Sequence, residues 1–192
     1  MMRYTFLKIC LLIIFLQFCN KIYPQIPAVS AGLVFSSETD FNKLPTGNPG
    51  AFARVFIKLN KNLKLAPSLT AFAPKKKFFG GADQATLKNY MFHGDVDLHY
   101  SLYKDYPLRI VGFGGLNSTI LFSKWDIPET QYVSNKKGVG LGVNLGAAIN
   151  MFIDNSWDAY VSGKIIAGTY NQIVINLGIV YYAEGLRRKG GW

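Results

Sequence analysis

Two histidines and two aspartates occupy alternate positions within one short stretch of the chain. They are His93, Asp95, Asp97 and His99, and these two histidines are the only ones in the sequence. On a β-strand such residues share one face at Cα spacings of about 6.6–7 Å, close enough for neighbours to share a metal ion. No second group of candidate ligands accompanies them in the sequence. We therefore expect no metal here and favour a network of buried charges.

Basic residues with the same alternation in other segments would neutralise these carboxylates. A buried charge is tolerated when it is paired. Folding the strands about their connections places Lys58 near Lys64 and Lys64 near Asp95. It also places Arg109 near His99. The predicted interior charge network consists of Arg54, Lys58, Lys64, His93, Asp95, Asp97, His99, Arg109 and Lys164.

The sequence contains no recognisable catalytic arrangement. The histidines are confined to one face of one predicted strand, away from the loops in which barrel enzymes carry their active sites. No combination of serine, histidine and carboxylate suggests acyl transfer, and the glycines of the segment 138–146 lack the spacing of a phosphate-binding loop. We expect a protein that is not an enzyme and that holds no cofactor.

Hydrophobic residues alternate with polar or small residues through most of the chain after Ala28. In the segment 139–149, Val, Leu, Ala and Ile at odd positions alternate with Gly, Asn and Ala at even positions. Strict alternation over nine or more residues is typical of strands with one apolar face. The expected strands are 28–36, 50–60, 63–73, 86–102, 108–121, 138–152, 158–168 and 172–183.

The connections between these strands are alternately long and short. Long links follow the first, third and fifth strands, and short ones follow the second, fourth and sixth. In an up-and-down arrangement, alternate connections lie at the same end, as in outer-membrane barrels with short periplasmic turns and longer external loops. We predict an all-β fold: an eight-stranded antiparallel up-and-down transmembrane β-barrel with both termini in the periplasm.

The apolar faces of the strands are expected to point outward, toward lipid. The opposite faces are rich in small residues such as Gly140, Gly142 and Gly146. Small residues suit the interior of an eight-stranded barrel, which has room only for packed side chains. A soluble periplasmic lipocalin-like barrel that binds a ligand shows the same alternation and stays open as an alternative.

The first 25 residues have the features of a cleavable signal peptide. Basic Arg3 and Lys8 precede an apolar run over 9–18, which is shorter than the about 20 residues of a membrane-spanning helix. The predicted domains are therefore a signal peptide, 1–25, and an outer-membrane β-barrel, 26–192.

Both cysteines, Cys10 and Cys19, fall within this signal, so no disulfide is expected in the mature chain. The full chain has a net charge of +10. A basic balance suits nucleic acid or anionic lipid. Because the chain is predicted to be exported, we expect no nucleic acid partner.

Three consecutive lysines, Lys75, Lys76 and Lys77, fall in the second long link. Outside an outer membrane, basic loops face the phosphates of lipopolysaccharide, so these residues are candidate contacts for lipid phosphate. A solvated run of charge is the alternative interpretation.

The last predicted strand reads Asn-Leu-Gly-Ile-Val-Tyr-Tyr-Ala at its end, over residues 176–183. This segment resembles the C-terminal insertion signal of outer-membrane barrels, in which a polar residue and a glycine precede alternating hydrophobic or aromatic residues. The resemblance implies that Asn176, Gly178 and Tyr181 help the barrel-assembly machinery to recognise the strand. Ala183 departs from the pattern, because an aromatic residue is usual at that place.

The mature chain as a whole resembles the class of small outer-membrane β-barrels that includes OmpX, the OmpA membrane domain and PorT-like proteins. The resemblance implies a location in the outer membrane of a Gram-negative cell, in contact with lipid, lipopolysaccharide and other envelope proteins. We expect a non-enzymatic integral protein with a structural or surface-interaction role through its long external loops. An accessory subunit of an outer-membrane secretion or uptake machine is the alternative.

Overall fold

The computed structural model describes residues 28–37, 48–79, 85–127 and 132–182, so the predicted signal peptide lies outside the described residues. These residues form nine β-strands of one antiparallel sheet. Among them, no helix has the length and apolar character needed to cross a membrane. The strands are β1 (Ala28–Ser36), β2 (Asn48–Lys58), β3 (Leu63–Phe72), β4 (Lys75–Phe79), β5 (Ala85–Asp105), β6 (Leu108–Ile127), β7 (Tyr132–Phe152), β8 (Trp157–Gly168) and β9 (Gln172–Tyr182).

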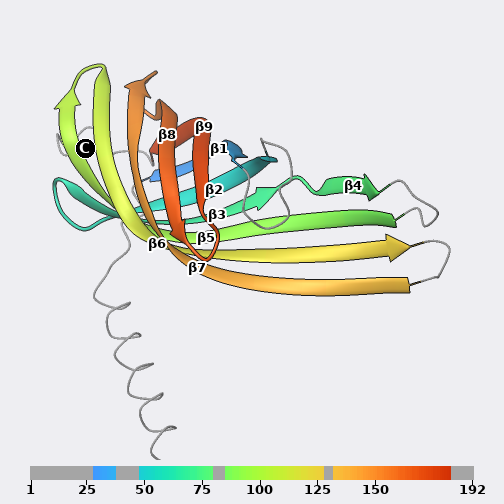
Figure 1. Cartoon of the computed structure of the whole chain (residues 1–192). Helices are drawn as coiled ribbons and strands as arrows, with labels where there is room; N and C mark the ends of the chain where they lie inside the picture. Colours follow the sequence, from blue (N-terminus) through green and yellow to red (C-terminus); the bar gives the residue numbers. More distant parts are fainter. Residues whose placement is uncertain (1–27, 38–47, 80–84, 128–131, 183–192) are drawn as a thin grey trace, which may run out of the picture.

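Eight of these strands close into a barrel (Figure 1). The ring closes because β1 pairs with β9 and β3 pairs with β5, while β4 is attached to β5 alone. When pairing partners are followed from strand to strand once round the barrel, starting at Phe92, the path returns to β5 at Tyr103. The offset along β5 is eleven positions and includes the irregularity between Ser101 and Tyr103. Such an offset tilts the strands, and eight tilted strands enclose just enough space for side chains. The predicted eight-stranded antiparallel barrel is confirmed.

Three strands run far beyond the barrel at the end predicted to carry long loops (Figure 1). β5 and β6 pair out to Thr86 and Asp126, β6 and β7 pair out to Ile127 and Tyr132, and β4 lies along the edge of β5. The prediction of loops over residues 74–85 and 123–138 is therefore wrong at 75–79, 85, 123–127 and 132–138, which are strand. Outside the barrel the sheet encloses no core, so its side chains need not alternate strictly between apolar and polar. Backbone hydrogen bonds alone are enough to extend these strands.

Side-chain caps stabilise the short turns at the opposite end. Asn60 Oδ1 accepts hydrogen bonds from the backbone N–H groups of Asn62 and Leu63, at 2.9 and 2.8 Å. Asp154 Oδ1 caps the turn between β7 and β8 in the same way. Such contacts replace ladder hydrogen bonds and let the chain reverse direction within a few residues.

Apolar side chains cover the outside of the barrel, and polar side chains fill much of its inside. Along β7, Leu141 and Leu145 are 70% and 73% exposed, whereas Asn144 and Asn150 are buried. Large exposed hydrophobic residues also come from β1, β3, β5, β6, β8 and β9. Because a water-soluble barrel buries its apolar residues, this surface suits lipid and argues against a soluble lipocalin-like barrel.

Aromatic side chains gather on the outside near the short turns. Tyr103 and Tyr106 are exposed on one hairpin, and the rings of Trp157 and Tyr181 lie 4.8 Å apart between centroids. Such rings are typical of the level at which a barrel crosses from lipid to water. They mark the membrane interface at the short-turn end.

Two glycines on neighbouring strands, Gly146 on the inner face and Gly163 on the outer face, offer a matched test of the interior packing. A Cβ atom at Gly146 would lie 2.4 Å from the backbone oxygen of Gly163 and 2.6 Å from the ring of Phe113, whereas a Cβ at Gly163 would meet nothing within 4 Å. We expect Gly146→Ala to lower the free energy of unfolding by about 1–3 kcal/mol. Gly163→Ala should change it by no more than about 0.5 kcal/mol. Urea unfolding in lipid vesicles measures both, and equal losses would contradict the crowded inner wall.

Candidate functional site

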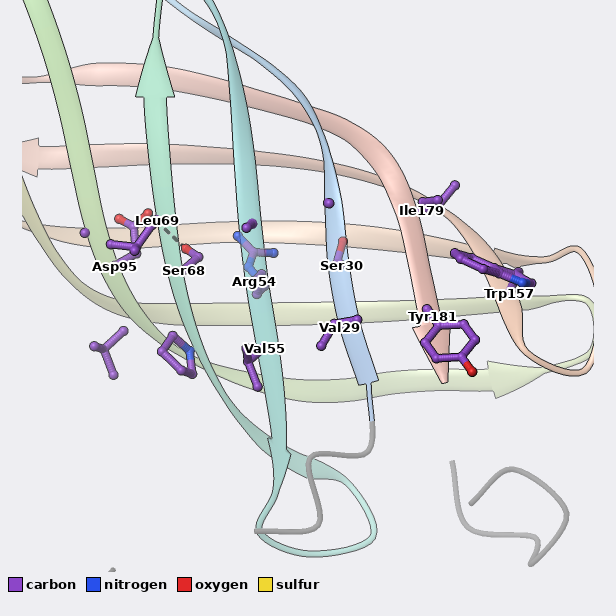
Figure 2. A pocket seen from close by; sticks show the side chains of 15 residues that line it. Val29, Ser30, Arg54, Val55, Ser68, Leu69, Asp95, Trp157, Ile179 and Tyr181 are labelled. Carbon is purple, nitrogen blue, oxygen red and sulfur yellow. Dashed lines mark hydrogen bonds between the residues drawn. The ribbon is translucent and has the colours of Figure 1, made fainter. Parts of the chain in front are cut away.

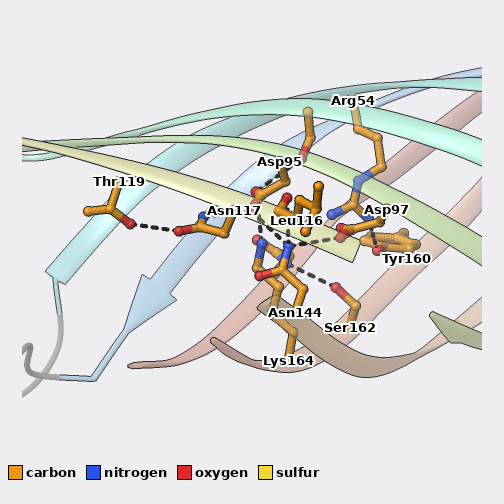
Figure 3. Close-up of polar contacts among 12 residues, drawn as sticks. Arg54, Asp95, Asp97, Leu116, Asn117, Thr119, Asn144, Tyr160, Ser162 and Lys164 are labelled. Atoms are coloured by element: carbon orange, nitrogen blue, oxygen red, sulfur yellow. Dashed lines mark hydrogen bonds and ion pairs between the residues drawn. The ribbon is translucent and has the colours of Figure 1, made fainter. Parts of the chain in front are cut away.

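The interior polar network centres on Asp95 of β5 (Figure 3). Lys164 Nζ lies 2.8 Å from Asp95 Oδ2, and both side chains are buried. Asn117 Nδ2 and Asn144 Nδ2 donate to Asp95 Oδ1 at 2.7 and 3.0 Å. Ser68 Oγ donates to Oδ2 at 3.2 Å. One carboxylate therefore links its own strand to β3, β6, β7 and β8 across the interior.

The second aspartate is held less tightly. Asn144 Nδ2 donates to Asp97 Oδ1 at 2.8 Å, but Asp97 Oδ2 has no hydrogen-bond partner among the described residues. Thr119 Oγ1 donates to Asn117 Oδ1 at 2.8 Å, which orients that amide toward Asp95. Asp95 is therefore the residue on which the network depends, and Asp97 lies at its margin.

Aromatic rings surround the cation of β2. Arg54 Nη1 donates a hydrogen bond to the hydroxyl of Tyr160. The Arg54 Cζ atom lies 5.7, 5.9 and 5.5 Å from the ring centroids of Phe52, Phe113 and Tyr160. A cation over aromatic faces is stabilised by the ring quadrupoles. The ring of His99 stacks on Phe113 at 4.6 Å, so this part of the interior is held largely by aromatic contacts.

The described surroundings of His93 include an aromatic ring. Both ring nitrogens of His93 lack a hydrogen-bond partner among the described residues, and its ring meets the edge of Phe72 at 4.8 Å. Within the part of the chain that the structure describes, no group of three or more His, Cys, Asp or Glu is placed to hold a metal ion.

Lys64 does not lie beside Asp95. In the β3–β5 register Lys64 is opposite His99, and Ser68 is opposite Asp95. The predicted pairing of Lys64 with Asp95 is wrong because the chain makes an excursion through β4 between these strands, so no tight turn sets their register. Lys58 lies opposite Lys64.

Arg109 does not lie beside His99 either. It lies opposite Lys104, because β5 and β6 continue pairing to Asp105 and Leu108 and leave a turn shorter than predicted. Arg109 Nη1 donates to the hydroxyl of Tyr182 at 3.4 Å. This predicted network residue therefore lies at the mouth of the barrel, away from Asp95.

The residues of the predicted insertion signal all lie in β9. Asn176 is buried, and its Nδ2 donates to Ser162 Oγ at 3.0 Å. Gly178 lies opposite Gly32, and a Cβ on it would come within 2.3 Å of the backbone oxygen of Ala31. Tyr181 is on the outside, in the aromatic contact with Trp157 described above. Each of the three positions thus has a structural role in the folded barrel.

No protein-family model matches the sequence, and no curated protein matches it. Among solved structures, the chain is similar to Ail, the attachment invasion locus protein of Yersinia pestis, with a TM-score of 0.55 and 13% identity over 80% of this chain and 95% of that one. A major outer membrane protein from Thermus thermophilus gives 0.55 and 11% identity over 81% and 99%. The N-terminal β-barrel domain of Pseudomonas aeruginosa OprF gives 0.52 and 14% identity over 81% and 96%.

The chain has the fold of a small outer-membrane β-barrel. The predicted structural class is therefore confirmed at the level of fold. The lipid-compatible outer surface agrees with this fold, and so does an interior filled with side chains.

The outer surface carries an open groove of about 790 Å³ over β1, β2, β3 and β5 (Figure 2). Outward-facing Val29 and Leu69 border it, with Trp157, Ile179 and Tyr181 at one side. Its walls are apolar, and it lies within the lipid-facing surface, so lipid chains suffice to fill it. Arg54, Ser68 and Asp95 also line it, but their side chains are buried in the interior.

The three lysines of the second predicted link lie in β4. In the register Lys75, Lys76 and Lys77 are opposite Asn89, Lys88 and Leu87 of β5. The expected loop is thus a strand, although its residues still lie beyond the barrel at the long-hairpin end. Their side chains lie outside the described part of the structure.

Proposed function

We propose that the chain is a non-enzymatic integral outer-membrane protein whose protruding sheet of β4–β7 is a surface for interaction outside the cell. The observation that carries this proposal is the free edge of β7. β8 pairs with β7 only from Gly142 to Phe152, so within the described residues the segment 132–140 pairs with β6 alone. An exposed strand edge presents N–H and C=O groups that can pair with a strand of another protein.

The direction of the free backbone groups follows from one contact at the barrel rim. The backbone oxygen of Leu141 accepts a hydrogen bond from the N–H of Thr169 at 3.0 Å, so Leu141 faces the β8 side. Backbone groups alternate sides along a strand. Val139 and Lys137 therefore point their N–H and C=O groups toward the free edge, while the residues between them bond to β6.

Proline at position 137 tests this edge. We expect Lys137→Pro to reduce attachment of cells that carry the chain, to one another and to a solid surface, by at least about five-fold, because proline removes an edge N–H. The ladder with β6 should survive, since this N–H does not face β6. Lys137→Ala is the matched control for the lost charge. Equal attachment of the two variants, counted by microscopy, would argue against the edge as the interaction surface.

A second observation supports contact with lipopolysaccharide phosphate. Lys76, Lys88 and Lys124 form one row across β4, β5 and β6 in the register. The row lies just beyond Tyr90 and Phe122, which are partly exposed on the outer face. Ail has been solved in complex with sucrose octasulfate, a heparin analogue, so a protein of this fold can bind a polyanion. Basic residues just outside an apolar belt suit the level of lipid phosphates.

Two further partners remain proposals. The barrel-assembly machinery would recognise β9 through Asn176, Gly178 and Tyr181. An accessory role in a secretion or uptake machine would use the same protruding sheet or the barrel flank as its interface. Co-purification of other envelope proteins in mild detergent would favour the accessory role over a surface-interaction role.

A further inference from the structure

A cavity of about 180 Å³ opens at the short-turn end, between the β5–β6 turn and the ends of β7 and β8. Its walls carry two cations, Lys104 and Arg109, and two carboxylates, Asp105 and Asp158. Asn150 completes the polar wall and lies opposite Arg109 in the β6–β7 register. The cavity is therefore balanced in charge, with both signs within one small space.

Two buried polar atoms of this wall are unused. Arg109 Nε and Asn150 Oδ1 have no hydrogen-bond partner among the described residues. Asn150 is 6% exposed, and the bond from Arg109 Nη1 to Tyr182 is long, at 3.4 Å. Buried polar groups are nearly always satisfied in folded proteins. One free donor and one free acceptor side by side therefore point to a ligand that accepts from the first and donates to the second.

The other polar groups of the wall are already oriented. Tyr182 donates its hydroxyl to Asp158 Oδ2 at 2.6 Å. Lys104 Nζ donates to Asn62 Oδ1 at 2.9 Å. Lys104 lies opposite Arg109 in the β5–β6 register, so two positive charges lie side by side and repel one another. A phosphate placed between Lys104 and Arg109 would relieve that repulsion.

The rim of the cavity is apolar and faces the membrane. Tyr106 is 77% exposed and Leu108 is 39% exposed, and the ring of Tyr106 lies 5.0 Å from that of Phe152. These residues lie at the same end as the aromatic rings that mark the membrane interface. The cavity thus opens at the level of lipid headgroups, where a headgroup can enter while its chains stay along the barrel wall.

We propose that this cavity binds the headgroup of a zwitterionic phospholipid that carries a primary ammonium group. The phosphate accepts hydrogen bonds from Arg109 and Lys104, and the ammonium group donates to Asn150 Oδ1 and lies near Asp158. An anionic headgroup such as phosphatidylglycerol matches the cations but brings no ammonium group to donate to Asn150 Oδ1, and it adds a negative charge near Asp158. The site is at the opposite end of the barrel from the protruding sheet, so it is independent of the proposed surface interaction.

Native mass spectrometry of the full mature barrel, delipidated in detergent, tests the proposal. Phosphatidylethanolamine is expected to bind about tenfold more tightly than phosphatidylglycerol, as one charge-assisted contact would give. Arg109→Gln and Asn150→Leu should each weaken phosphatidylethanolamine binding by about tenfold. Lys136→Gln, which removes an exposed cation at the other end, should leave it unchanged.

Three results would overturn the proposal. They are equal binding of the two phospholipids, unchanged binding by both cavity variants, and displacement of the lipid by inorganic phosphate as readily as by O-phosphoethanolamine. The last would mean that the site recognises phosphate alone, from a soluble source. Heat-modifiable gel mobility confirms that each variant is folded, and Asn150→Leu keeps the test available should Arg109→Gln fail to fold.

Discussion

Asparagine in place of Asp95 is expected to destabilise the barrel by about 3–5 kcal/mol, the loss typical of removing one partner of a buried ion pair. Lys164 is 4% exposed and would remain inside the barrel without its counterion. The two amides that donate to Asp95 Oδ1 would also face an altered acceptor. Urea unfolding in lipid vesicles, followed by tryptophan fluorescence, measures the change.

Asp97 supplies the matched control for this experiment. It lies on the same face of the same strand and is equally buried, but it receives one hydrogen bond and has no ion pair in the described structure. Asp97→Asn should cost no more than about 1.5 kcal/mol. Asp95→Leu combined with Lys164→Met should recover much of the loss, because apolar replacements of both partners remove the buried charge. Equal losses for Asp95→Asn and Asp97→Asn would mean that the ion pair does not hold the barrel together.

The face on which Asp95 lies could be predicted from the sequence, but its partner could not. Alternation alone assigns Asp95 and Lys164 to the interior. The distance between them depends on the registers of three strand pairs, β5–β6, β6–β7 and β7–β8, because β8 reaches β5 only across the lumen. The amides of Asn117 and Asn144 could not be predicted from the sequence for another reason. They are neutral and carry no signal of their own beyond their inward-facing positions.

In the protruding sheet, the alternation of apolar and polar residues no longer predicts where a strand begins or ends. Regular alternation predicts one strand that ends near residue 121 and a next strand that begins near residue 138. In the structure β6 continues to Ile127, and β7 begins at Tyr132. Within the membrane a strand must place an apolar residue outward at every second position. Beyond the membrane both faces meet water, and only the backbone ladder is needed. The sequence therefore predicts the membrane-spanning part of each strand better than the strand itself.

Arginine at position 145 is expected to destabilise the barrel in lipid by about 2–4 kcal/mol, the cost of a basic side chain facing lipid near the bilayer midplane. Leu145 is 73% exposed and lies midway along the outward row from Val139 to Met151 on β7. Met151→Arg is the matched control, since a cation near the interface can reach water and costs about 0–1 kcal/mol. Urea titrations in vesicles compare the two variants. A soluble barrel would tolerate a charge equally at both exposed positions. Equal stability of the two variants would therefore overturn the membrane-spanning assignment. A protein partner would then be needed to cover the apolar surface.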